Sequence, residues 1–321
     1  MYICPSCKTE YKLPSCPKCG HTPSCVDDIW QMTDAPDIVT NGDGDKYIGY
    51  EYIGESYSGN RKYMLEYPNV LFANEISRLT GDGIFLDLGC GDGCFTVPAA
   101  MNGTRIVAAD ISNTMLKILK DKAFYNDISL KNVTLCRMNA LNLVLADNTV
   151  ECVVSNSVLH LISRPEKVVQ EIYRVLKPGG YFAIKDDRPG KTPDTLFNND
   201  EYNKIVNELY GQYWKLLELK GVKPVKYSWK FDREAVCAEL FSRKEEIIIP
   251  VQTEFSNKLK DGFIPRFLGR GFSDQVDVPA HLHDEAVRNV IEQLKEKYGN
   301  DFDEVSFRGI EPDIIMTVYK K

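Results

Sequence analysis

Two features of the sequence carry residues that could do chemistry. The first is LDLGCGDG at residues 86–93, in which three glycines, two acids and a cysteine follow an apolar pair. A glycine-rich turn at the end of a parallel strand lets a ligand approach backbone N–H groups closely, at the sheet edge where such folds bind ligands. The second is a group of four cysteines in the first 20 residues. These features predict a small-molecule site and a metal site.

The cysteines have the spacing of metal ligands. Cys4-Pro-Ser-Cys7 and Cys16-Pro-Lys-Cys19 are two C-P-x-C turns and resemble those of zinc ribbons and rubredoxin-like knuckles. Four thiolates complete the tetrahedral coordination of Zn²⁺. We therefore predict a structural zinc ion held by Cys4, Cys7, Cys16 and Cys19, with an iron centre or a redox dithiol as the alternatives. A closed site of this kind stabilises a small module and leaves no position open to substrate.

The spacing of the glycines indicates whether the turn binds a dinucleotide or another cofactor. Gly89, Gly91 and Gly93 form G-x-G-x-G after Asp87. Dinucleotide-binding turns favour G-x-G-x-x-G, with the pyrophosphate on the N-terminus of the following helix. The spacing therefore points away from NAD.

Alternating strands and helices must position this turn. Apolar residues recur at helical spacing over 168–176, and KPGG ends that helix. The pattern predicts an α/β protein: a doubly wound, Rossmann-like, seven-stranded sheet with an N-terminal zinc ribbon and a helical lid insertion. The predicted strands are residues 84–88, 105–110, 133–138, 150–156, 181–186, 245–255 and 313–320.

We divide the chain into four parts. Residues 1–25 are the zinc-ribbon module, and residues 26–69 are an acidic linker and the N-terminal lid segment. Residues 70–190 are the Rossmann-like cofactor-binding core. Residues 191–321 contain the helical insertion, the rest of the lid and the last two strands. The linker assignment rests on residues 26–45, which hold six Asp and no Lys or Arg.

The composition is that of an ordinary globular protein, with 43% hydrophobic and 26% charged residues. No apolar run approaches the ~20 residues of a membrane span, and the start lacks the pattern of a signal peptide. We therefore expect a cytoplasmic protein with no membrane partner. The net charge of −7 disfavours a nucleic-acid partner, because phosphate contacts need clustered Lys and Arg.

Several stretches together resemble class I S-adenosylmethionine-dependent methyltransferases of the UbiE, type 11 kind. They are IFLDLGCGDG, VAADIS, MNALNLVLADNTVECVVSNSVLHLI and EIYRVLKPGGYFAIKD, and the resemblance covers roughly residues 47–190. It implies S-adenosyl-L-methionine as the cofactor. The cofactor-binding residues that it implies are Asp87, Gly89, Cys90, Gly91, Gly93, Asp110, Ile111, Asn139, Ala140, Ser155 and Asn156.

The resemblance also implies roles for individual positions. Asp110 would accept hydrogen bonds from the ribose hydroxyls, with a helix N-cap as its alternative role. Asn139 stands where the family has an acid that faces adenine, which is a departure from the pattern. Ser155 and Asn156 match the position whose backbone lines the methionine end. His160 is a candidate general base, with packing beside the cofactor as the alternative.

Two aromatic segments are candidates for a lid over the methyl end of the cofactor. One precedes the first strand, and the other, residues 256–275, precedes the last helix. Arginines in the second could bind an anionic substrate group, with a surface role as the alternative. The predicted lid and substrate residues are Tyr47, Tyr52, Tyr57, Arg266, Phe267 and Arg270.

We therefore expect an enzyme that transfers a methyl group to a small molecule. One alternative is an RNA base methyltransferase whose zinc ribbon holds RNA, an arrangement that resembles a bacterial ribosomal RNA guanine methyltransferase. Against it, residues 1–25 carry only three Lys beside one Glu, and the linker is acidic. The other alternative is a non-catalytic adaptor that binds zinc and cofactor. The sequence identifies neither the acceptor, nor the methylated atom, nor the oligomeric state.

Overall fold

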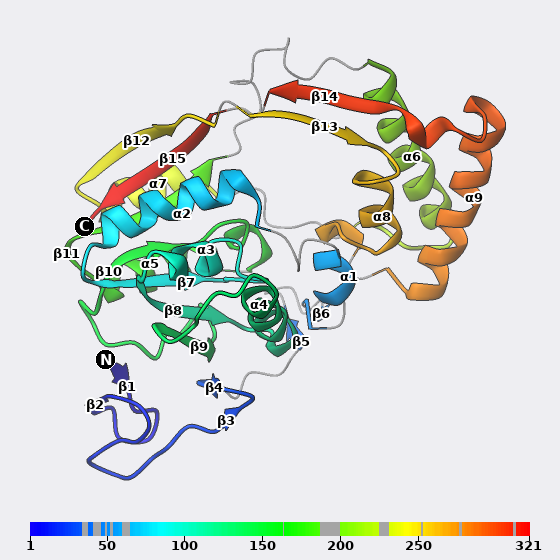
Figure 1. The fold of residues 1–321 in the computed structure, drawn as a ribbon. Helices are drawn as coiled ribbons and strands as arrows, with labels where there is room; N and C mark the ends of the chain where they lie inside the picture. Colours follow the sequence, from blue (N-terminus) through cyan, green and yellow to red (C-terminus); the bar gives the residue numbers. More distant parts are fainter. Residues whose placement is uncertain are drawn as a thin grey trace.

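The computed structural model describes residues 1–33, 38–40, 46–48, 50–51, 54–59, 65–162, 164–186, 200–224, 231–251, 253–275, 278–310 and 313–321. At its centre is a nine-stranded sheet with the order β12-β15-β11-β10-β7-β8-β9-β4-β3 (Figure 1). The strands are β3 (Cys25–Val26), β4 (Ile29–Gln31), β7 (Ile84–Leu88), β8 (Arg105–Asp110), β9 (Val133–Arg137), β10 (Val150–Val154), β11 (Leu176–Asp186), β12 (Arg243–Ile249) and β15 (Ile314–Lys320).

The seven strands from β12 to β9 confirm the predicted Rossmann-like fold. Strands β7 to β11 pair in parallel, whereas β15 is antiparallel to both β11 and β12. One predicted strand was too long: β12 ends at Ile249, before Pro250, which lacks the N–H that a ladder requires. Residues Glu254–Lys258 (β13) instead pair with Ser306–Ile310 (β14) in a separate two-stranded sheet.

The sheet also has two strands that the sequence did not predict. Ile29, Trp30 and Gln31 of β4 pair in parallel with β9, and β3 pairs with β4. This segment begins the stretch that we interpreted as an acidic linker. Its acids Asp27 and Asp28 lie in the exposed turn between the two strands, with positive φ angles, while Ile29 is fully buried. Burial of that apolar residue outweighs the acidic composition.

Helices cover both faces of the sheet. One face packs against α2 (Tyr67–Thr80), α3 (Thr96–Met101) and α4 (Asn113–Tyr125). The other packs against α5 (Pro165–Val175) and α7 (Arg233–Leu240). Among the helices that the structure describes, none is long and apolar enough to cross a bilayer.

A helical lobe lies beyond the carboxyl end of the parallel strands (Figure 1). It contains α6 (Asp200–Leu219), α8 (Phe263–Leu268) and α9 (Ala280–Tyr298), which share their own apolar core. The short helix α1 (Gly54–Ser58) lies between this lobe and α4, because Gly54 packs on Met115 of α4 and Tyr57 faces Arg266 of α8. The N-terminal segment and the lobe are therefore neighbours in space.

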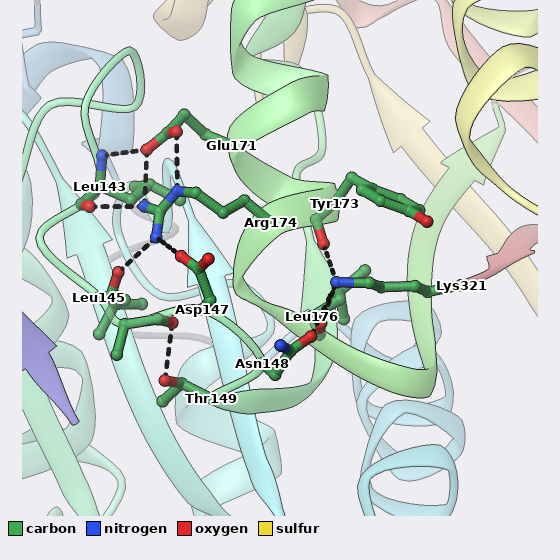
Figure 2. A network of polar contacts seen from close by, with 11 residues as sticks. Leu143, Leu145, Asp147, Asn148, Thr149, Glu171, Tyr173, Arg174, Leu176 and Lys321 are labelled. Carbon is green, nitrogen blue, oxygen red and sulfur yellow. Dashed lines mark hydrogen bonds and ion pairs between the residues drawn. The ribbon is translucent and has the colours of Figure 1, made fainter.

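Arg174 of α5 holds the loop between β9 and β10 in place (Figure 2). Its guanidinium donates to the carbonyls of Leu143 and Leu145 at 2.8 Å each, and to the Asp147 carboxylate at 2.7 Å. It also forms a paired contact with Glu171, which in turn accepts a bond from the Leu143 N–H at 2.9 Å. One half-buried side chain thus binds two carbonyls and one carboxylate of this loop.

Candidate active site

A cavity of about 310 Å³ opens at the carboxyl ends of the parallel strands. Its walls come from the ends of β7, β8 and β9, from the segment after β10, and from Lys185 near the end of β11. Tyr50, Tyr57, Glu66 and Asn69, which precede the first of these strands in the sequence, also line the cavity. Four of the strand ends predicted to bind the cofactor therefore share one cavity.

The glycine turn after β7 needs glycine on steric grounds. Gly89, Gly91 and Gly93 have φ angles of +74°, +53° and +79°, which disfavour residues with a side chain. A Cβ on Gly89 would overlap the Val158 side chain, and one on Gly93 would lie 2.6 Å from Cγ of Leu119. Gly89 and Gly91 line the cavity, whereas Gly93 packs behind it. The turn therefore exposes backbone to any ligand in the cavity.

Asp110 joins this turn to the start of α4. Its carboxylate accepts hydrogen bonds from the N–H groups of Gly91 and Ser112, each at 2.9 Å. Burial raises the pKa of this carboxyl group, and the two backbone bonds oppose that rise. The alternative role as helix N-cap is wrong, because Ser112 caps α4 by accepting a bond from the Met115 N–H at 3.1 Å. Asp110 also lines the cavity, where it is available to a ligand.

Two further acids of the turn are held by internal partners. Asp87 is 2% exposed and accepts a bond from the Thr96 hydroxyl at 2.7 Å. Asp92 forms a buried ion pair with Lys122 at 3.2 Å, in which both side chains are 3% exposed. Burial raises the pKa of Asp87 to about 7, with Asp110 contributing to the rise. Asp87 is therefore largely protonated in mildly acidic solution.

The raised pKa of Asp87 predicts a pH-dependent stability. The pKa of an unfolded Asp is about 3.9, so between about pH 4 and pH 7 the folded state binds more protons. The free energy of unfolding should then fall as the pH rises through this window, by roughly 1.4 kcal/mol for each step of one in pH. Denaturant titrations at several pH values should show a shallower fall for Asp87→Asn and an unchanged fall for Asp121→Asn, an exposed acid on α4. Equal slopes for all three proteins would contradict the prediction.

The residues predicted to face adenine lie at the end of β9. Asn139 and Ala140 line the cavity, together with Met138 and Leu141. The side-chain oxygen of Asn139 accepts a bond from the Leu141 N–H at 2.9 Å. The other polar group of this side chain is its amide nitrogen, which is a donor, whereas the family's acid would offer an acceptor. Ile111 also lines the cavity, and its carbonyl accepts a bond from Arg137.

The residues after β10 divide into lining and non-lining positions. Asn156 lines the cavity. Ser155 does not; it is 2% exposed, and its hydroxyl has no hydrogen-bond partner among the described residues. His160 does not line the cavity either, although residues on both sides of it do. Burial lowers the pKa of His160, which keeps its imidazole neutral. Its role as a general base stays a prediction without support from this geometry.

Of the predicted lid and substrate residues whose side chains the structure describes, only Tyr57 lines the cavity. Tyr57 lines the cavity, its ring centroid lies 4.7 Å from that of Tyr50, and the Arg266 guanidinium lies 5.8 Å from it. The two segments therefore meet beside the cavity. Arg266, Phe267 and Arg270 do not line it. Phe267 is fully buried among the aromatic side chains of the lobe, and Arg270 donates to the Val278 carbonyl. Tyr52 and the side chain of Tyr47 lie outside the described residues.

Sequence reasoning missed several polar residues of the cavity wall, among them Glu66, Asn69 and Lys185. Glu66 and Asn69 begin α2, where the Asn69 amide donates to the Glu66 carboxylate at 2.7 Å. Lys185 is the next-to-last residue of β11. Its place beside a strand end was a signal that could have identified it.

The four N-terminal cysteines converge as predicted. Their sulfur atoms all lie within 4.8 Å of one another, and the Cys4–Cys19 and Cys7–Cys16 pairs are 3.5 and 3.6 Å apart. Tetrahedral ligands at about 2.3 Å from a zinc ion would be about 3.8 Å apart, whereas a disulfide is about 2.05 Å long. The sulfur atoms therefore have the separation of metal ligands and not of disulfides.

The two cysteine turns have the same backbone structure. The N–H of Cys4 donates to the carbonyl of Thr9, and the N–H of Cys16 donates to that of His21. The residues after Cys7 and Cys19, Lys8 and Gly20, both have positive φ and donate to the first cysteine's carbonyl at 2.9 Å. This internal repeat places two equivalent pairs of thiols around one point, and none of the four cysteines lines the cavity.

Comparison with known protein families agrees with this site. Residues 86–184 match the family Methyltransf_11, which is described as a methyltransferase domain. They contain the glycine turn, Asp110, Asn139 and Asn156. This part of the chain is therefore a methyltransferase domain, and it lies on a Rossmann-like sheet with a cysteine cluster at its N-terminal side.

Two methyltransferases of known name are similar to part of this chain. The ubiquinone/menaquinone biosynthesis C-methyltransferase UbiE of Hydrogenovibrio crunogenus is 34% identical over 115 residues, which is 35% of this chain and 45% of the relative. The demethylmenaquinone methyltransferase of Listeria monocytogenes is 29% identical over 165 residues, which is 49% of this chain and 66% of the relative. This chain thus matches less than two thirds of the length of these relatives.

Solved structures with a similar arrangement include two with low sequence identity. The YcgJ protein of Bacillus subtilis has a TM-score of 0.46 at 14% identity, over 80% of this chain and 99% of that one. A phosphoethanolamine N-methyltransferase of Haemonchus contortus, in complex with S-adenosylhomocysteine, has a TM-score of 0.42 at 17% identity. That match covers 84% of this chain and 56% of that one.

Proposed function

We propose that this protein is an enzyme that transfers a methyl group from S-adenosylmethionine to a small molecule. The observation that carries the proposal is Asp110, whose carboxylate joins the glycine turn to α4 and lines a cavity inside the methyltransferase domain. The relatives named above support methyl transfer, and their names place them in quinone biosynthesis. A quinone-like ring compound is accordingly one candidate for the acceptor.

The cavity residues fit this cofactor. Each Asp110 oxygen accepts one backbone bond, and a carboxylate oxygen has a second lone pair that can accept a bond from a ribose hydroxyl. Met138 to Leu141 would contact the adenine, and the turn at Gly89 and Gly91 would contact the methionine part. When bound, S-adenosylmethionine supplies an electrophilic methyl group. The chain's own contribution is to orient the acceptor and to exclude water, for which Tyr50 and Tyr57 are placed at the cavity wall.

The charges near the N-terminal module favour a small molecule over RNA. Lys117 pairs with Asp27 at 3.2 Å, and Lys120 pairs with Asp28 at 2.9 Å. The acidic turn that follows the cysteine cluster therefore neutralises two lysines of α4. A surface that binds RNA phosphates would instead present such lysines unpaired.

We also propose that Cys4, Cys7, Cys16 and Cys19 hold one zinc ion with a structural role. Four thiolates at these separations suit a soft tetrahedral ion, and they leave no fifth position for a substrate. None of the four cysteines lines the cavity, which supports a role in folding and not in the reaction.

Two measurements, made one after the other, test the proposed function. Calorimetry should first show that S-adenosylhomocysteine binds and that NADH does not. Labelled S-adenosylmethionine should then pass its methyl group to a component of a metabolite fraction, and not to tRNA or ribosomal RNA. Transfer to RNA would favour the RNA methyltransferase, binding without any transfer would favour the adaptor, and binding of NADH alone would reject the cofactor assignment.

A further inference from the structure

Acidic side chains outnumber basic side chains in the cavity wall. Among the described residues that line it, Glu66, Asp87, Asp92 and Asp110 are acidic, and Lys185 is the only Lys or Arg. Each acid already has a partner. Glu66 accepts from the Asn69 amide and Asp87 from the Thr96 hydroxyl. Asp92 pairs with the Lys122 ammonium, and Asp110 accepts from two backbone N–H groups. Among the described residues, Lys185 has no ion pair or hydrogen bond, so none of them competes with a ligand for its ammonium group.

The strand register places Lys185 on the same face of the sheet as the start of α2. Side chains alternate along a strand, so Lys185 shares its face with Ala183 and Tyr181. Ala183 packs in the same apolar cluster as Phe72 and Ile76 of α2. Because α2 begins at Tyr67 beside Glu66, Lys185 and Glu66 stand on one side of the cavity.

The order of the strands identifies this side as the acceptor side. Along the carboxyl edge the order is β9, β8, β7, β10, β11. In the proposed function, adenine lies at β9, ribose at β8 and methionine at β7. Neighbouring strands are about 4.8 Å apart, so β11 lies about 10 Å beyond β7. Lys185 is thus past the end of the cofactor, where an acceptor must enter.

We propose that Lys185 binds an anionic oxygen of the methyl acceptor. The acceptor is then an apolar molecule with one acidic hydroxyl or carboxyl group, since Tyr50, Tyr57, Phe95, Leu161 and Ile162 line the same cavity. This inference rests on the proposed function and adds the class of substrate. A cation beside an acidic group favours the ionised form of that group.

Binding of two matched probes to the full-length protein saturated with S-adenosylhomocysteine tests the inference. The probes are 2-naphthoate and 2-naphthalenemethanol, which share a ring system and differ in charge. We expect the wild type to bind the carboxylate about tenfold more tightly than the alcohol, as a charged hydrogen bond predicts. Lys185→Met should remove this preference, and Lys185→Arg should keep it. The control Lys167→Met, at an exposed position on α5, should behave as the wild type.

The affinity for S-adenosylhomocysteine separates this inference from the function on which it rests. We expect Lys185→Met to keep that affinity within about twofold. A loss of about tenfold, with the preference for naphthoate retained, would show that Lys185 binds the cofactor's own carboxylate and would overturn the inference. Failure of both probes to bind the saturated wild type would also overturn it. If the wild type does not bind S-adenosylhomocysteine at all, the proposed function fails first.

Discussion

Replacing Asp110 with alanine should abolish detectable binding of S-adenosylhomocysteine. The wild-type carboxylate accepts two backbone bonds at 2.9 Å, and in the complex it would also accept bonds from the ribose hydroxyls. Each hydrogen bond to a charged group contributes about 1.5 to 3 kcal/mol, so two lost ribose bonds correspond to at least a roughly hundredfold loss of affinity. Isothermal titration calorimetry measures this directly. Asp121→Ala, at an exposed acid on α4, is the matched control.

A second variant tests the same site without removing Asp110. Gly89→Ala places a Cβ against the side chain of Val158 at a residue whose φ is +74°, so the turn must move. We expect a comparable loss of binding. Gly211→Ala is the control, because Gly211 lies in α6 with open space around it and should gain about 1 kcal/mol of stability. Full affinity in both Asp110→Ala and Gly89→Ala would mean that the cofactor binds elsewhere.

The core of this site could be predicted from the sequence because its signals are local. Asp110 ends a predicted strand, and the glycine turn ends the strand before it in the chain. Parallel strands bring their carboxyl ends to one edge, so the topology alone makes the two neighbours. The hydrogen bond between Asp110 and the Gly91 N–H is the outcome.

Other features depend on contacts between distant segments. Ile29 and Trp30 were predicted to belong to an acidic linker, because their partners in β9 lie about a hundred residues later. Lys185 and Glu66 share a wall only once α2 has packed on β11. Phe267 was predicted to belong to a lid, but its ring packs against Tyr213 with a centroid distance of 4.9 Å. The apolar side chains of α6 and α9 bury it in the core of the helical lobe. Composition identifies apolar side chains and not the surfaces that bury them.

The cysteine module is joined to the loop between β9 and β10, which contributes residues to the cavity wall. The Ile3 N–H donates to the Val144 carbonyl at 2.8 Å, and the Ala146 N–H donates to the Met1 carbonyl at 3.0 Å. Cys4 and Cys16 belong to the same apolar cluster as Leu143 and Leu145 of this loop. The loop begins with the cavity residues Met138 to Leu141, and Arg174 holds its other side. Loss of the module should therefore loosen the loop on one side only.

Cys16→Ser should consequently unfold residues 1–25 while the methyltransferase domain stays folded. The module has few apolar residues and would depend on its metal for stability, since structural zinc sites in small modules contribute about 10 kcal/mol or more. Hydrogen exchange should reach unfolded rates in residues 1–25 and stay slow in β7, β8 and β10. Residues 143–146 should show an intermediate increase, because Arg174 still binds the carbonyls of Leu143 and Leu145.

The same variant should weaken cofactor binding without abolishing it. Met138 to Leu141 would lose support on the module side, so we expect about a tenfold loss of affinity for S-adenosylhomocysteine, well short of the Asp110→Ala effect. Cys25→Ser, at an exposed cysteine outside the cluster, should change neither exchange nor affinity. Elemental analysis should find one zinc ion per wild-type chain and none in Cys16→Ser. Iron in its place, or a protected module in the variant, would reject the structural zinc site; unchanged affinity beside an unfolded module would show that Arg174 and Glu171 hold the loop alone.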